Sequence, residues 1–179
     1  GLITTRRFSD ADEFLQTLEQ TAPKVFRSAP VRRMTRELER ARAVELQRQT
    51  ALEDTLETAR RNGLNVGTWD ALTTSIQKLD EAETTLCRDE GERNTVAELR
   101  RQLDGLLLTI RQRSDKQAGE FLVDFRKRFD MVQLDAPHDL GQLRPLLEKA
   151  RPIEALPGVA EKIRERVDEV VSRLEGAIS

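Results

Sequence analysis

The chain has 179 residues, of which 35% are charged, 37% are hydrophobic and 4% are aromatic, with no tyrosine. Its 30 basic and 32 acidic residues are well mixed and leave a net charge of −2, so no overall field attracts nucleic acid or an anionic membrane. The low apolar fraction suits long amphipathic helices better than a compact globule, and the longest apolar run, Leu106 to Leu108, is far too short to span a bilayer.

Two helices are expected in the first third of the chain. The first covers about 10–21, because Ser9 precedes acidic residues that favour a helix start and Pro23 follows the apolar pattern. The second begins at residues 28–30 (Ser-Ala-Pro), where a proline in the first turn loses no hydrogen bond. It ends at Gly63, which is expected to supply a left-handed cap.

The second helix loses its apolar stripe in its middle, at Glu45, Arg48 and Gln49. If the second and third helices fold back on each other about residue 65, this interruption faces Glu83, where the third helix also loses its stripe. The sequence therefore predicts a shared polar layer in which Arg48 approaches Glu83. Such layers specify the register of packed helices at some cost in stability.

The third and fourth helices both carry apolar residues at helical spacing. The third is expected to be capped by Thr68 and to continue to Leu86. The polar stretch 87–94 is expected to be a turn, so the fourth helix is expected to start at Asn94 or Thr95.

Residues 111–117, RQRSDKQ, carry no apolar side chain and separate two apolar stripes of the fourth helix. Because this stretch contains neither proline nor glycine, we expect one continuous helix that leaves one bundle and enters another here. The alternative is a surface loop that breaks a single compact bundle. Beyond the stretch, Phe121, Phe125 and Phe129 share one face. We expect them to pack against the aliphatic face of the last helix, the alternative being an exposed groove for a partner helix.

The long helix is expected to end in a turn at 135–138. Pro145 and Pro152 are expected to break the following segment into helices of one or two turns. The last helix follows a turn at 156–158 and keeps apolar residues on one face to the end of the chain.

No segment alternates polar and apolar residues as a strand would, so the expected fold is all-α, with elongated antiparallel bundles. Two short bundles are expected to share one long helix. The expected domains are a short helix and linker at 1–27, a three-helix bundle at 28–113 and a second bundle at 114–179. This arrangement resembles tandem spectrin-type repeats in architecture alone, without a motif of that family. The start, Gly-Leu-Ile, reads as a cleavage scar, so the chain is expected to be a piece of a larger protein.

The segment LPGVAEKIRERV, 156–167, resembles the hairpin of helix-hairpin-helix DNA-binding modules. In that family a Pro-Gly-Val/Ile-Gly turn offers backbone N–H groups to a phosphate, and here Ala160 stands in place of the second glycine. The resemblance implies phosphate contacts by Gly158, Lys162 and Arg164. The alternative is an ordinary helix start after a tight turn, with its apolar residues in the core.

The sequence offers no constellation for catalysis, for a cofactor or for a metal ion. One histidine, His138, and one cysteine, Cys87, cannot form a structural zinc site. The single cysteine also excludes an internal disulfide and favours a reducing, cytoplasmic location. Trp69 is expected to plug a core near a helix start, the alternative being an exposed anchor for a partner.

These features favour a non-catalytic helical scaffold or protein–protein interaction module from a larger intracellular protein, with a protein partner and no membrane partner. The candidate docking residues are Trp69, Phe121, Phe125 and Phe129. One alternative is a nucleic-acid-associated domain that uses the turn at 157–164. Another is a regulatory or recognition insert of an enzyme whose catalytic part lies outside this chain.

Overall fold

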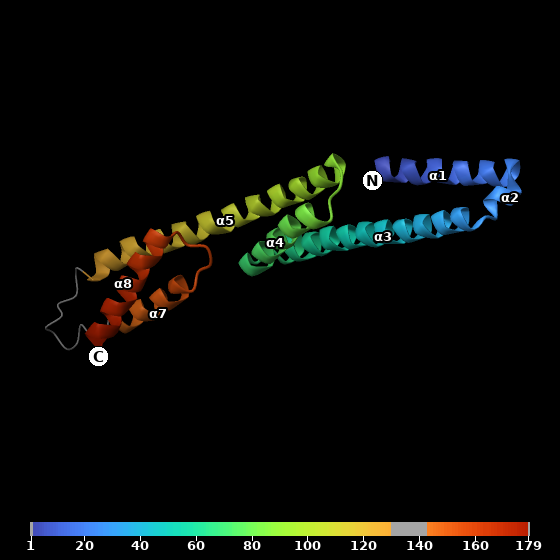
Figure 1. The fold of residues 1–179 in the computed structure, drawn as a ribbon. Helices are drawn as coiled ribbons and strands as arrows, with labels where there is room; N and C mark the ends of the chain where they lie inside the picture. The colour runs from blue at the N-terminus through green and yellow to red at the C-terminus, as the bar shows by residue number, and fades with distance from the viewer. Residues whose placement is uncertain (1, 130–142, 179) are drawn as a thin grey trace. The chain divides into compact units, whose positions relative to one another are not determined.

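The computed structural model describes residues 2–129 and 143–178, with side chains from residue 7 onward apart from that of Phe129. These residues form helices joined by short turns and contain no strand, so the predicted all-α class is confirmed (Figure 1). The chain divides into two compact units, residues 1–67 with 71–103 and residues 68–70 with 104–179. The predicted turn at 135–138 lies outside the described residues. The elements are α1 (Leu2–Thr21), α2 (Pro23–Phe26), α3 (Ala29–Ala59), the π-helix η1 (Arg60–Val66), α4 (Trp69–Thr85), α5 (Glu90–Phe129), α7 (Leu143–Glu154) and α8 (Glu161–Ile178).

In the first unit, α1 folds back along α3 through the short helix α2 and forms an antiparallel hairpin with it (Figure 1). Arg42 of α3 holds α1, because its Nη2 donates to the Phe8 carbonyl at 3.0 Å and lies 2.5 Å from the Asp12 carboxylate. Its guanidinium also lies 5.5 Å from the centroid of the Phe8 ring, a favourable cation–π geometry. The predicted helix start at residue 10 is wrong. α1 begins at Leu2, since no helix breaker precedes Ser9.

The end of α3 passes into η1 before the chain turns into α4. The left-handed residue here is Gly67, with a φ of 61°, so the predicted cap at Gly63 is wrong. Gly63 is buried for another reason: a Cβ on it would lie 2.5 Å from Cδ2 of Leu103 on α5. The missing side chain of Gly63 therefore lets η1 and α5 approach each other closely.

α4 and the first part of α5 complete the core of the first unit. Arg100 Nε on α5 lies 3.0 Å from Asp80 Oδ1 on α4, which pairs the two helices at their surface. α5 begins at Glu90, before the predicted residue 94 or 95, because Asp89 Oδ1 accepts the Glu92 backbone N–H at 2.9 Å and caps the helix. The buried apolar residues of this core are Leu52, Leu56, Ala59, Leu72, Leu79, Ala82, Val96, Leu99 and Leu103.

α5 runs unbroken from Glu90 to Phe129, so the continuous helix predicted through 111–117 is confirmed. Within this stretch Ser114 is buried, and Asp115 Oδ1 accepts the backbone N–H of Ala160 at 2.7 Å. The polar stretch is thus the part of α5 that meets the start of α8. Small or hydrogen-bonding side chains take the place of the apolar stripe there.

In the second unit, α5 packs with α7 and α8 around one apolar core. The prediction that prolines break residues 144–154 is wrong, because α7 is a single helix. Pro145 stands in its first turn, where no N–H is needed, and Pro152 removes only one hydrogen bond near its end. The buried residues of this core are Ala118, Phe121, Phe125, Leu143, Leu146, Ala150, Val167, Val170, Val171 and Leu174.

Candidate functional site

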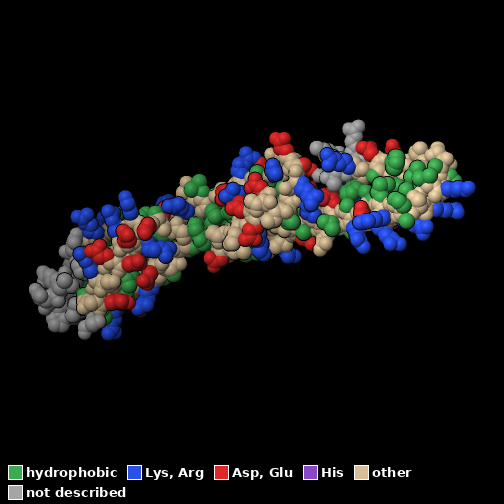
Figure 2. Space-filling model, viewed as in Figure 1, with side chains coloured by type: hydrophobic (Ala, Val, Ile, Leu, Met, Phe, Trp, Pro, Cys, Tyr) green, Lys and Arg blue, Asp and Glu red, His purple; other side chains and the backbone are tan. Residues whose placement is uncertain are grey.

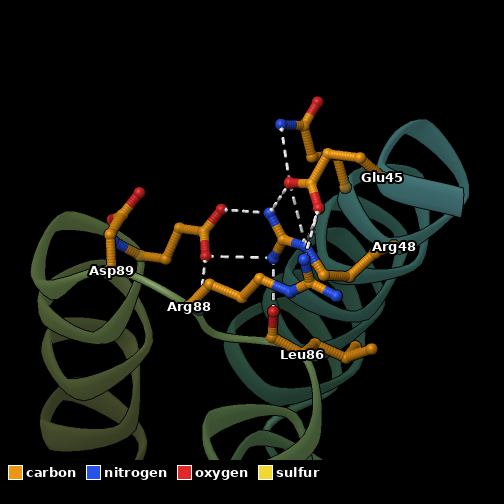
Figure 3. Close-up of polar contacts among 7 residues, drawn as sticks. Glu45, Arg48, Leu86, Arg88 and Asp89 are labelled. Carbon is orange, nitrogen blue, oxygen red and sulfur yellow. Dashed lines mark hydrogen bonds and ion pairs between the residues drawn. The ribbon is translucent and has the colours of Figure 1, made fainter. Parts of the chain in front are cut away.

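A buried ion-pair layer joins α3 to the start of α5 in the first unit (Figure 3). Arg48 lies between two carboxylates, with its Nη2 at 2.6 Å from Glu45 Oε1 and at 2.7 Å from Glu92 Oε1. Its Nη1 also donates to the backbone carbonyl of Leu86, just after α4. Arg88 adds a second cation at 3.1 Å from Glu45 Oε2. One guanidinium therefore joins α3, the turn that follows α4 and the start of α5.

The sequence predicted this layer and its central arginine, but the predicted partner was wrong. Glu92, not Glu83, lies against Arg48 in the structure. The cause is the early start of α5, which makes Glu92 a residue of the first helical turn. Gln49 belongs to the layer as predicted, since its Nε2 donates to Glu45 Oε1 at 3.3 Å.

The charges in the layer are stabilised by their mutual contacts. Hydrogen bonds from Arg48 hold the pKa of both Glu45 and Glu92 below the ordinary value of 4.5. Burial raises the pKa of the neighbouring Cys87 thiol. Near neutral pH the two carboxylates are therefore ionised and the thiol is protonated. These groups offer neither a poised general acid nor a thiolate nucleophile, and the arrangement serves to hold the helices together.

The rest of the described chain shows no metal-binding arrangement. Within residues 2–129 and 143–178, no three His, Cys, Asp or Glu side chains are grouped so as to hold a metal ion. Over the same ranges, no helix has the length and apolar character needed to cross a membrane. His138 lies outside the described residues.

The turn at 156–160 is built around contacts with the second unit's own residues. Gly158 has a φ of 69°, and a Cβ on it would lie 2.3 Å from Cζ3 of Trp69. The Trp69 indole therefore covers this glycine, while the Asp115 carboxylate binds the backbone N–H of Ala160 at 2.7 Å. The half-buried Trp69 packs inside its own unit, and one N–H group at the start of α8, the kind of group that binds phosphate at a helix N-terminus, is bound by a carboxylate of the chain.

The two basic residues predicted to contact phosphate lie on the first turns of α8. Arg164 Nη2 donates to the Leu156 carbonyl at 3.1 Å, which closes the turn on itself. Lys162 is exposed. The structure therefore does not bring Gly158, Lys162 and Arg164 together around an open anion site.

The phenylalanine row predicted on α5 belongs to the core of the second unit. Phe121 and Phe125 are 9% and 6% exposed, and their ring centroids are 6.3 Å apart. The predicted packing against the last helix is confirmed for these two rings, which share a core with Val167 and Val170. A partner can reach them only if this unit opens. The side chain of Phe129 lies outside the described residues.

A different apolar surface is uncovered on the hairpin of α1 and α3. No side chain described between residues 7 and 44 is buried. Phe14, Met34 and Val44 are 58%, 44% and 58% exposed, and Ala41 is exposed as well. At 100° per residue, these four side chains lie on the same side of the antiparallel pair. Figure 2 shows apolar side chains gathered over α1 and the first half of α3. We call these four residues the hairpin face.

Sequence reasoning did not find the hairpin face, because it assigned residues 1–27 to a short helix and linker and not to a long helix paired with α3. What distinguishes the hairpin face from the residues that contact α1 is the angular position of each side chain around α3. Arg42 of α3 contacts α1, and at 100° per residue Met34, Ala41 and Val44 lie about 80°, 100° and 160° around the helix from it. Comparison of the chain with models of protein families, with curated proteins and with solved structures gives no match.

Proposed function

We propose that the chain is a non-catalytic helical scaffold that binds a protein partner through the hairpin face. The observation that supports this is an incomplete bundle. Met34, Ala41 and Arg48 follow one another at seven-residue spacing on α3. Arg48 is covered by the start of α5, whereas Met34 and Ala41 are exposed. An apolar helical face without a cover favours the docking of further helices.

The energetics support a docking role. Burying a large apolar side chain contributes about 1.5–3 kcal/mol, so Phe14, Met34 and Val44 together offer several kcal/mol to a partner. By contrast, the ion-pair layer is already satisfied by the chain's own residues. We place the protein in a reducing, intracellular compartment, because its single cysteine, Cys87, is free and buried.

The test compares capture of binding proteins by three tagged forms of the full chain. One is the wild type, and the second replaces the hairpin face by Phe14→Ser, Met34→Ser and Val44→Ser. A matched control replaces similarly exposed apolar residues elsewhere, by Leu64→Ser, Val66→Ser and Leu108→Ser. A captured protein is then purified and titrated against each form. We expect binding to be lost only with the hairpin variant, and equal binding by all three forms would overturn the proposal.

The contacts of the turn at 156–160 favour no second function. A nucleic-acid role would need the N–H groups at the start of α8, and the Ala160 N–H is bound by Asp115. We expect no salt-dependent gel shift with double-stranded or single-stranded DNA. We also expect no gel shift with Lys162→Ala, because the Lys162 side chain is exposed and does not belong to a formed phosphate-binding site.

A further inference from the structure

We infer that the partner of the hairpin face is the hairpin face of a second copy of this chain, so that two hairpins form a four-helix bundle. This inference rests on the proposed docking function and names the partner. It is carried by the charges on the two edges of the hairpin face. These edges are opposite in sign, which makes the surface complementary to itself.

The edge formed by α3 is basic. At 100° per residue, Arg33 and Arg40 lie about 20° and 40° beyond Val44 around α3, on the side away from the other apolar residues of the hairpin face. Arg40 is exposed and has no ion pair among the described residues. The Arg33 side chain is 84% exposed, and among the described residues its ion pair is with Glu37 on its own helix, at 3.1 Å.

The edge formed by α1 is acidic. Asp10 and Glu13 lie beyond Phe14 on the outer side of α1, and both are exposed. Neither has an ion pair among the described residues. The net charges of the two arms of the hairpin differ in the same direction as the charges of their edges. α1 has two basic and four acidic residues, whereas residues 22–44 have seven basic and two acidic ones.

Of the two possible orientations of a two-fold axis, only one brings edges of opposite charge together. An axis parallel to the helices places α3 of one copy over α1 of the second copy, in antiparallel fashion, so each basic edge meets an acidic edge. An axis across the helices would instead place α3 on α3, with basic edge against basic edge. The charges therefore select the first orientation and disfavour the second.

The size of the surface suits a reversible dimer. At 1.5 Å per residue, α1 is about 30 Å long, and two helices about 10 Å apart give a face of roughly 600 Å². A standard interface buries about 800 Å² per partner, so we expect association in the micromolar range.

The test is reciprocal charge reversal in the full chain. One variant, Arg33→Glu with Arg40→Glu, makes both edges acidic. The other, Asp10→Lys with Glu13→Lys, makes both edges basic. Among the described residues, none of these four side chains forms a hydrogen bond or ion pair with the opposite helix of its own hairpin, so circular dichroism should show unchanged helix content. The matched control, Arg111→Glu with Arg113→Glu, reverses two exposed arginines of the second unit.

Sedimentation velocity over a concentration series should show dimers of the wild type and of the control. For each reversal variant alone, the dissociation constant of the dimer should be at least about tenfold higher than that of the wild type. An equimolar mixture of the two variants should recover the wild-type affinity, with mixed dimers identified by native mass spectrometry.

A wild type that stays monomeric at about 100 μM would overturn the inference, because an interface of this size should associate in that range. A mixture no more associated than its components would do the same. Neither result would decide the proposed docking function, which the capture experiment with the hairpin variant tests separately.

Discussion

Arg48 is a charged side chain that is only 6% exposed, and such a charge is tolerated only when it is paired. We expect Arg48→Leu to lower the free energy of unfolding by about 3–5 kcal/mol, because Glu45 and Glu92 would lose their shared buried cation and Arg88 contacts only Glu45 of the two from its side chain. Replacing Glu45, Arg48 and Glu92 together with leucine should cost far less or even stabilise the unit. Urea unfolding measures both. A triple variant as unstable as the single one would contradict this explanation.

The same layer predicts a pH dependence. The pKa values of Glu45 and Glu92 are lower in the folded state than the ordinary 4.5, so the folded chain binds fewer protons than the unfolded one in acid. Their contribution to stability is therefore complete above about pH 4.5 and is lost as the pH falls through the folded-state values. Urea midpoints between pH 7 and pH 3 should fall less steeply for Glu92→Gln than for the wild type. Parallel slopes would show that Glu92 does not carry the effect.

Gly158 has two reasons to be glycine, and they can be separated. Its φ of 69° disfavours any side chain, and the Trp69 ring fills the space that a Cβ would need. We expect Gly158→Ala to cost about 1–3 kcal/mol in the wild type and less in a Trp69→Phe background. Because Trp69 is the only tryptophan, its fluorescence emission reports this contact directly and should shift to the red in Gly158→Ala. Unchanged emission would mean that the ring does not lie on Gly158.

Among the helices, α8 supplies four buried apolar residues to the core of the second unit. Val167, Val170, Val171 and Leu174 are buried, and each contributes about 1.5–3 kcal/mol. A chain that ends at Leu156 should therefore lose the second unit, bind a hydrophobic dye and lose more helix than the removed residues account for. Glu165→Gln, on an exposed position of α8, is the control. A truncated chain that melts like the full one would show that this core is held without α8.

The positions of four long helices were predictable from the sequence, but the residues at which they end and the elements that cover them were not. α3, α4, α5 and α8 carry apolar stripes whose spacing reflects burial on one face, so the pattern alone predicts them. The start of α5 was missed because Asp89, Asn94 and Thr95 are all good caps, and the contact of Glu92 with Arg48 favours the first. The hairpin face was missed because exposed and buried stripes look alike in sequence. Burial depends on which other element packs on a helix face, and the spacing of residues along one helix carries no information about that.

Over the whole molecule, α5 is the element that both units use. Its residues up to Leu103 belong to the first unit and those from Asp104 onward to the second. A continuous helix transmits unfolding from one unit to the other only as far as its own hydrogen bonds persist. Gly105 lies directly after Asp104, and apart from its chain neighbours and the adjoining helix backbone no described atom lies within 4 Å of the place where its Cβ would be.

This position tests whether the units unfold together. Gly105→Ala should raise the free energy of unfolding by about 0.5–1 kcal/mol, because it removes a helix-weakening glycine without a clash. Gly105→Pro should instead break the helix, at about 3 kcal/mol, and uncouple the two units. Trp69 fluorescence follows the second unit, and far-UV circular dichroism follows all helices. The two unfolding curves should coincide for Gly105→Ala and separate for Gly105→Pro. Curves that coincide in the proline variant would show that coupling does not depend on α5.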